Sequence, residues 1–399
     1  LDGDTIFEVI IGDGSGALYV LDGSGQVRSG FPVYTDVRSD LASDAPAFQE
    51  VSLVRGSITA SPAAGDLDGD GDIELVVADD VGLIYAWHHD GTVVDGFPYT
   101  AVGRLPSEID NEHTYDNGFF GAPTLYDMDD DGTLEIIATG LDSRLYVLEH
   151  TGEDWGNYPI EVCAPENCGV RGTRIITSPA IGDVDNDGDL DIGVAANEAT
   201  RNDSYSVSFV FDANSGEALP NWPAEVSGLV GEAVLLPLIG EGHPASLSFA
   251  DLDQDGDLEI ANAVMLGTNP PIHHDTTDAL PVDFYSTGFH PDSNADVPAL
   301  IQMVANPVFG DLNGDGSPEY ITTGVSSVYI AALAARKMIE YQQGVGAWSG
   351  KDGSIMPGWP RQLEDVQFLS AAGVADVSGD GNPEVIAVSA GYLAHAWDQ

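Results

Sequence analysis

The chain has 399 residues, of which 43% are hydrophobic, and its 66 acidic residues against 12 basic ones give a formal net charge of −54. Such a charge would repel nucleic acid and anionic membranes, and no apolar run is long enough to span a bilayer. We therefore expect no nucleic-acid partner and no direct membrane insertion.

An acidic motif organises the chain and is clearest in residues 61–78, SPAAGDLDGDGDIELVVA. Asp66, Asp68 and Asp70 alternate, a glycine follows, and Glu74 stands four residues after Asp70. Alternate acidic residues around a glycine bend are typical of a loop that wraps oxygen ligands around one Ca²⁺ ion. An EF-hand would need a Glu at position twelve and flanking helices. Here position nine is acidic and β-branched runs follow, so the loop is predicted to join two strands.

Copies of the motif recur along the whole chain. The first, LDGDTIFEVIIG, begins at its second position and keeps Asp2, Asp4 and Glu8. The copies after residue 78 have these residues at positions one, three, five and nine: Asp127, Asp129, Asp131 and Glu135; Asp183, Asp185, Asp187 and Asp191; Asp251, Asp253, Asp255 and Glu259; Asp311, Asn313, Asp315 and Glu319; Asp376, Ser378, Asp380 and Glu384. From residue 66 onward, first positions are separated by 61, 56, 68, 60 and 65 residues. Such a period is the mark of a repeat architecture.

Each acidic loop is followed by a strand and a hairpin, as in GLIYAWHHDGTVVDGFPYT (residues 82–100), whose Asp-Gly turn supplies positive φ. A unit of four strands cannot bury both faces alone, so the units must pack around an axis. We predict an all-β fold, a single seven-bladed β-propeller domain over 1–399. Its repeats are expected at about 1–57, 58–118, 119–174, 175–243, 244–304, 305–366 and 367–399. The aromatic residues of the Gly-Phe-Pro and Gly-Trp-Pro turns are expected to pack between blades.

The Gly-Asp-x-Asp-x-Asp-Gly loops between short strands resemble FG-GAP repeats, also called VCBS-type repeats. These are the units of the integrin α-chain β-propeller and of many secreted bacterial proteins. The resemblance implies that the side chains at positions one, three, five and nine hold Ca²⁺ together with the carbonyl at position seven. Those carbonyls belong to Asp72, Thr133, Asp189, Asp257, Ser317 and Asn382.

Five to seven structural Ca²⁺ ions are expected, because two copies depart from the pattern. Ser378 replaces an acid in the last loop, and Thr5 replaces the glycine in the first. Closure of the propeller predicts that the first and last repeats are neighbouring blades, since closure removes exposed sheet edges.

An extracellular location, secreted or at the cell surface, is expected for this chain. Only two lysines stand beside ten arginines, and open calcium loops of this kind would stay empty at the low free Ca²⁺ of a cytosol. Cys163 and Cys168 bracket four residues and are expected to form a disulfide. Two free thiols are the alternative, and a zinc site lacks two further ligands nearby.

No catalytic motif occurs in the chain: there is no Gly-x-Ser-x-Gly, no phosphate-binding loop and no His-Glu-x-x-His. We therefore predict no enzyme but a binding or adhesion module of a longer surface protein, with a protein or glycan ligand at a cell surface or matrix. A lectin or polysaccharide-active enzyme on the same scaffold is one alternative, and a structural component of a surface assembly is another. The segments 101–120 and 266–305, whose aromatic residues include Phe119 and Phe284, are expected to meet the partner. The alternative is that these aromatic residues cap the hydrophobic ends of neighbouring blades.

Overall fold

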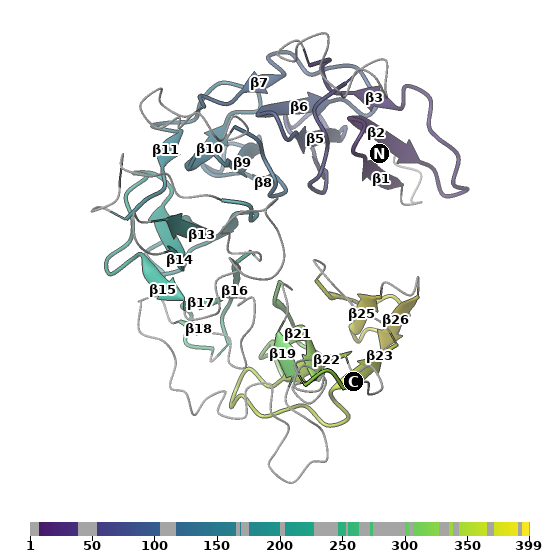
Figure 1. Cartoon of the computed structure of the whole chain (residues 1–399), viewed down its shortest axis with the longest axis vertical. Helices are drawn as coiled ribbons and strands as arrows, with labels where there is room; N and C mark the ends of the chain where they lie inside the picture. Colours follow the sequence, from purple (N-terminus) through teal and green to yellow (C-terminus); the bar gives the residue numbers. More distant parts are fainter. Residues whose placement is uncertain are drawn as a thin grey trace. The chain divides into compact units, whose positions relative to one another are not determined.

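The computed structural model describes residues 8–38, 54–103, 117–164, 168, 175–199, 204–226, 246–252, 254–262, 272–273, 300–302, 306–326, 335–337, 343–364, 371–389 and 393–398. Within these ranges the regular elements are strands, most of which are labelled in Figure 1, and none is a helix. No helix that could span a membrane was found in this part of the chain.

The chain divides into two compact units, and the first comprises residues 1–179, 198–203 and 214–216. Its described part holds three antiparallel sheets, in each of which the strands follow chain order. Their strands are β1 (Val9–Gly12), β2 (Ala17–Leu21) and β3 (Val33–Tyr34); β4 (Ala63–Gly65), β5 (Glu74–Ala78), β6 (Leu83–Trp87) and β7 (Tyr99–Thr100); and β8 (Thr124–Tyr126), β9 (Glu135–Thr139), β10 (Arg144–Leu148) and β11 (Ile160–Glu161).

The second unit comprises residues 180–197, 204–213 and 217–399, and its described part holds four antiparallel sheets. Their strands are β12 (Ala180–Gly182), β13 (Asp191–Ala199), β14 (Ser204–Asp212) and β15 (Ala224–Val226); β16 (Ser248–Ala250), β17 (Glu259–Ala261) and β18 (Ile272–His273); β19 (Leu300–Gln302), β20 (Val308–Gly310), β21 (Glu319–Ser326), β22 (Gln343–Trp348) and β23 (Arg361–Leu363); and β24 (Gly373–Ala375), β25 (Glu384–Val388) and β26 (Ala394–Trp397).

One strand pairs across a predicted repeat boundary. β19 precedes residue 304, yet it pairs with β21 of the next sheet through Gly324–Ser326. The reason is the length of β21, because β20 pairs only with its first three residues, Glu319 to Ile321. β19 therefore pairs with the part of β21 that extends beyond its pairing with β20.

Neighbouring sheets pack face to face within each unit, as β5 shows. Leu75 and Val77 belong to a core cluster with Leu18 of the first sheet, whereas Val76 and Ala78 belong to a cluster with β9 and β10 of the third. Successive strand residues point to opposite faces, so both faces of this sheet are covered. This explains the continuous apolar run that follows the acidic loop. Similar clusters join neighbouring sheets of the second unit.

The aromatic residues of the Gly-Phe-Pro and Gly-Trp-Pro turns are buried, as predicted: Phe31, Phe97 and Trp359 are each at most 9% exposed. Tyr158 and Trp222, which precede proline but follow asparagine, are buried as well. Phe31 lies in the core between the first and second sheets, and Phe97 lies in the core between the second and third. These side chains therefore stabilise sheet packing and are not free to contact a ligand.

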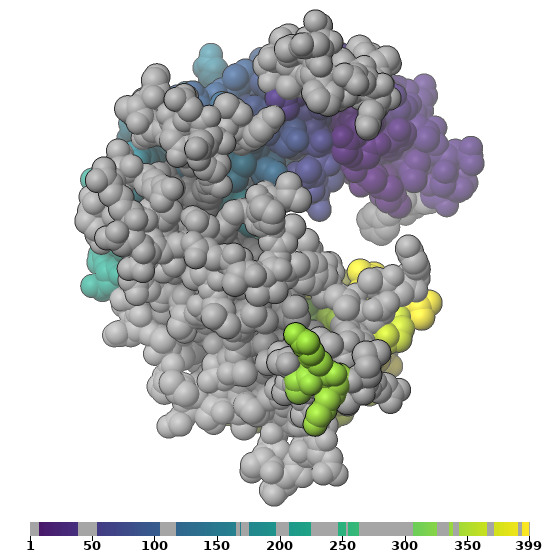
Figure 2. Space-filling model, in the orientation of Figure 1, coloured from purple at the N-terminus to yellow at the C-terminus, as the bar shows by residue number. Residues whose placement is uncertain are grey.

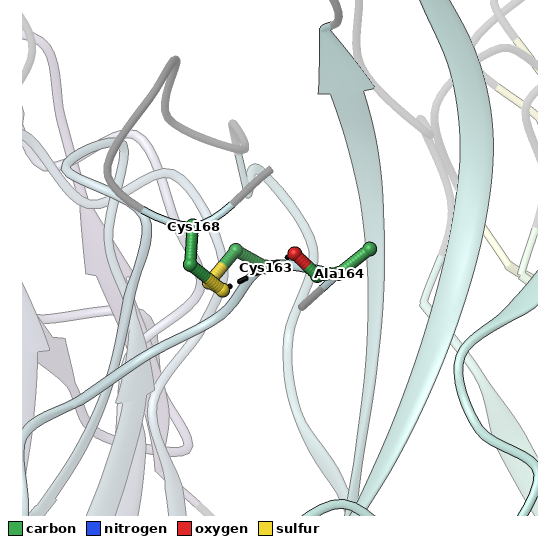
Figure 3. The surroundings of a disulfide bond; sticks show 3 residues. All are labelled: Cys163, Ala164 and Cys168. Carbon is green, nitrogen blue, oxygen red and sulfur yellow. Dashed lines mark hydrogen bonds between the residues drawn. A yellow bond between two sulfur atoms is a disulfide. The ribbon is translucent and has the colours of Figure 1, made fainter. Parts of the chain in front are cut away.

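Cys163 and Cys168 form a disulfide shortly after β11, with their Cα atoms 5.2 Å apart (Figure 3). The backbone N–H of Cys168 donates a hydrogen bond to the carbonyl oxygen of Ala164 (3.1 Å), and the Cys168 Sγ lies 3.2 Å from the same oxygen. Both cysteines of the chain take part in this bond.

The expectation that the aromatic residues of 101–120 face a partner is wrong for Phe119. Its side chain is fully buried and meets Tyr146 edge to face, with ring centroids 5.5 Å apart. Phe119 belongs to the core between the second and third sheets, because it follows the connection directly and enters the next sheet. Residues 104–116 and nearly all of 266–305, including Phe284, lie outside the described part of the chain.

Candidate metal loops

Each complete acidic motif forms a loop between the first and second strands of one sheet, not counting the additional strand β19 of the sixth sheet. We call these acidic loops and number their positions one to nine: 66–74, 127–135, 183–191, 251–259, 311–319 and 376–384. Position nine begins the second strand, and it pairs with the residue just before position one, as Gly65 pairs with Glu74 and Tyr126 pairs with Glu135. The two strands therefore hold the ends of the loop together.

Two residues with positive φ shape every acidic loop. Position six is always glycine, with φ between 88° and 103°. Position four also has positive φ, and it is occupied by glycine or by Asp130, Asn186 or Gln254. Glycine takes this conformation without strain, and short polar side chains tolerate it better than other residues. The glycine at position six therefore allows the left-handed backbone conformation that the loop needs.

Hydrogen bonds to the loop's own backbone fix the acidic side chains. In the loop at 127–135, the carboxylate of Asp127 accepts the N–H of Gly132 (2.9 Å), and Asp131 accepts that of Thr133 (2.8 Å). Glu135 reaches back from position nine and accepts the N–H of Met128 (2.7 Å). The bond from position two to position nine recurs in all six loops.

Four acidic loops bring three carboxylates together. One oxygen from each lies within 4.8 Å of the others in these sets: Asp66, Asp68 and Asp70; Asp127, Asp129 and Glu135; Asp183, Asp185 and Asp191; Asp376, Asp380 and Glu384. In addition, the Oδ1 atoms of Asp66 and Asp251 are buried and accept no hydrogen bond. Hard, anionic oxygens gathered in this way fit a calcium ion.

Position nine is buried in every acidic loop, and in three loops this burial raises its pKa. The residues Glu74, Glu135, Asp191, Glu259, Glu319 and Glu384 are all at most 4% exposed. Burial, and after it the neighbouring loop acids, raises the pKa of Glu135, of Asp191 and of Glu319 to about 7. A buried carboxylate that must stay ionised needs a cation beside it.

The hairpin after the third strand adds side chains that the motif does not contain. His88, which follows β6, places its Nδ1 3.0 Å from Oε1 of Glu74. Lys351, in the turn after β22, places its Nζ 2.9 Å from Oδ2 of Asp315. Sequence reasoning missed these residues, although their regular position after the third strand is a signal that could have found them.

Neighbouring loops of one unit also touch. The carbonyl of position two accepts a hydrogen bond from the next loop: Leu67 from the N–H of Leu134 (2.9 Å), Val184 from that of Leu258 (3.3 Å), and Leu252 from the hydroxyl of Ser317 (2.7 Å). In the third case position eight is Pro318, which has no N–H to donate. The Ser317 hydroxyl makes the contact instead.

The remaining predicted ligands are placed as follows. Asp2, Asp4 and Asp253 lie outside the described residues. Glu8, at position nine of the first motif, forms an ion pair with Arg28, whose Nη1 lies 2.8 Å from its Oε1. In the loop at 311–319, Asn313 donates from its Nδ2 to Oε1 of Glu319 (2.7 Å).

Residues 127–194, which contain two of the acidic loops, match the family model of the FG-GAP-like repeat. No curated protein sequence matches the chain. Among solved structures, the chain is similar to the BP39L lectin from Burkholderia pseudomallei (13% identity, TM-score 0.52), with 98% of this chain and 90% of the lectin covered.

The chain is also similar to Sqt1 from Saccharomyces cerevisiae (10% identity, TM-score 0.51), with 98% and 81% covered. The Dos1 propeller is 11% identical, with a TM-score of 0.50 and 98% and 82% covered. At these identities the likeness shows the fold alone, which is of the β-propeller type. The chain therefore carries an FG-GAP-like repeat in residues 127–194, and the predicted resemblance to that family is confirmed.

Proposed function

We propose that the chain is a calcium-stabilised β-propeller in which each of the seven sheets of the described residues is one blade. The observation that carries the proposal is the gathering of three carboxylate oxygens within 4.8 Å in four acidic loops. Such groups repel one another when ionised, and a divalent cation would neutralise them. The side chains at positions one, three, five and nine, with the carbonyl of position seven, would hold the ion.

In this proposal the calcium loops are structural and no residue has a catalytic role. The module works outside the cell, where millimolar Ca²⁺ fills weak sites, and it binds a protein or glycan at a surface or matrix. Its rigid blades would present the connections between sheets to that ligand, since loops on a rigid scaffold commonly carry recognition.

Thermal unfolding with and without Ca²⁺ tests the structural proposal. A site with a dissociation constant of about 10⁻⁴ M adds roughly 1–2 kcal/mol at 1–2 mM Ca²⁺, so several sites together add several kcal/mol. We expect a marked fall in melting temperature in excess chelator. Mg²⁺ at the same concentration is the control for general charge screening, because it prefers a smaller, octahedral site. Equal melting in Ca²⁺ and in chelator would contradict the proposal.

The binding role needs a separate measurement. The immobilised chain is presented to a glycan array and to a panel of matrix proteins, in Ca²⁺ and in chelator. Calcium-dependent binding to one class is expected. Cleavage of a polysaccharide would favour an enzyme instead, and the absence of any ligand would favour a structural component of a surface assembly.

A further inference from the structure

Two acidic loops of the chain have nearly the same sequence. Residues 311–319 read DLNGDGSPE, and residues 376–384 read DVSGDGNPE. Both loops carry acids at positions one, five and nine, a neutral polar residue at position three, and proline at position eight. From the sequence, the loop with Ser378 departs from the pattern, so any difference in cation binding would be expected to favour the loop at 311–319.

The structure nevertheless separates the two loops. Oxygens of Asp376, Asp380 and Glu384 lie within 4.8 Å of one another, but the three acids of the loop at 311–319 form no such group among the described residues. The difference is therefore in the arrangement of the carboxylates and not in their number.

Two side-chain nitrogen groups, an ammonium and an amide, contact carboxylates of the loop at 311–319. The Nζ of Lys351 lies 2.9 Å from Oδ2 of Asp315 and 3.4 Å from its carbonyl oxygen. At the other side of the loop, the Nδ2 of Asn313 donates to Oε1 of Glu319 (2.7 Å). Position five and position nine, which would both face an ion, thus already have donors.

Lys351 is placed for this contact by its own hairpin. Its backbone N–H donates to the Ser349 hydroxyl (3.2 Å), and the N–H of Gly353 donates to the Ser349 carbonyl (2.9 Å), which forms the turn after β22. The chain contains one other lysine, Lys337, so a lysine here is not a consequence of a lysine-rich surface. Arg28 and Glu8 form a comparable pair in the first motif.

We propose that Lys351, assisted by Asn313, takes the place of a divalent cation at the loop 311–319, so that this loop does not bind Ca²⁺ while the loop 376–384 does. The ammonium group supplies one positive charge to the loop's acids, and the amide satisfies the buried Glu319. The inference rests on the proposed calcium loops. It states that in the loop 311–319 the negative charge of the carboxylates is neutralised by a lysine and not by Ca²⁺.

Counting bound ions tests the inference. Equilibrium dialysis with Ca²⁺ alone is applied to the full chain and to variants at matching positions. Asp376→Asn should lower the number of bound ions by one, whereas Asp311→Asn should leave it unchanged. The double variant Lys351→Met with Asn313→Asp removes the cation, restores the missing acid and should bind one more ion than the natural chain. Loss of an ion in Asp311→Asn, or no gain in the double variant, would overturn the inference.

A measurement in chelator separates this inference from the proposed function. Without Ca²⁺, Lys351→Met should lower the melting temperature, because it leaves the acids of the loop without a cation. Lys337→Met is the matched control, since residues 335–337 are exposed and form the green patch of Figure 2. If the natural chain binds no Ca²⁺, the proposed function fails. Equal melting of the two lysine variants in chelator would overturn the role of Lys351 whatever the chain binds.

Discussion

The backbone N–H of Leu134 donates a hydrogen bond to the carbonyl oxygen of Leu67 and so joins the acidic loops of two neighbouring sheets. The backbone N–H of Leu67 in turn donates a hydrogen bond to Oε2 of Glu74 (2.9 Å). Leu67 therefore links the position-nine carboxylate of its own loop to the backbone of the next loop. A change in one loop is expected to reach its neighbour through this residue.

Replacement of Leu134 by proline tests this link, because proline lacks the N–H. Two other loops carry Pro318 and Pro383 at position eight, so the loop path accepts a proline. Leu134→Ala is the control, since it removes the side chain but keeps the N–H. We expect Leu134→Pro to lower the free energy of unfolding by about 1 kcal/mol more than Leu134→Ala, measured by urea unfolding. Equal losses would show that the bond contributes nothing.

The loop at 127–135 should respond to a lost charge in opposite directions with and without metal. Asp129 shares its oxygen cluster with Asp127 and Glu135. Asp129→Asn relieves repulsion, so in chelator the melting temperature should rise by a few degrees. In millimolar Ca²⁺ the same change removes a ligand charge, and the melting temperature should fall. Asp95→Asn, at an exposed residue outside the loops, is the control for net charge. A change of the same sign in both buffers would count against a metal site.

The local shape of the acidic loops could be predicted from the sequence because every contact that forms it lies within nine residues. Asp127, for example, binds the N–H of Gly132 five residues on. The apolar run from Leu75 to Val77 likewise indicated that a strand follows the loop, as β5 does. These features depend on residue type and spacing, which the sequence displays directly.

Contacts between distant segments could not be predicted in the same way. Lys351 reaches Asp315 across 36 residues, and nothing in the motif DLNGDGSPE indicates that a lysine will lie beside it. Phe119 follows a segment that breaks the repeat, and the sequence left open whether it meets a partner or packs against the blades; it is part of the core. In both cases the packing of one sheet or hairpin on another decides the outcome.

Stability should depend on pH through Asp79, which is fully buried just after β5. Its Oδ1 accepts the N–H groups of Val81 (3.0 Å) and Leu83 (2.8 Å), but burial, the largest effect, raises its pKa from 3.8 to about 6. The folded chain therefore holds this proton more tightly than the unfolded chain does. The free energy of unfolding should fall as the pH rises from about 4 to about 6, by roughly 3 kcal/mol from this group.

Asp79→Asn should remove that part of the pH dependence, because the amide keeps an oxygen acceptor and carries no charge. Urea unfolding of the natural chain and of the variant is compared between pH 4 and 7 in the same buffer. The difference between them isolates Asp79 from the loop carboxylates. Asp95→Asn, which removes an exposed carboxyl, should follow the natural chain. Parallel curves for the natural chain and Asp79→Asn would contradict the assignment.

The turns between third and fourth strands approach one another so closely that one glycine has no room for a side chain. Gly96 has a φ of 96°, and a Cβ atom there would lie 1.9 Å from the carbonyl oxygen of Thr151 in the turn of the next sheet. Gly25, in the turn that follows β2 in the first sheet, has a similar φ of 79°, but a Cβ atom there would meet nothing within 4 Å. A comparison of the two glycines therefore separates the energetic cost of the left-handed backbone from the cost of a steric clash.

Both alanine variants should lose stability, but by different amounts. Gly25→Ala should cost about 1–2 kcal/mol, the penalty of a left-handed backbone for a residue with a Cβ. Gly96→Ala adds a clash with a backbone atom that cannot rotate away, so the two sheets must separate locally, and we expect a loss larger by at least about 1–3 kcal/mol. Urea unfolding of the two variants measures the difference. Equal losses would mean that the turns of neighbouring sheets are not in the close contact that positions the second sheet against the third.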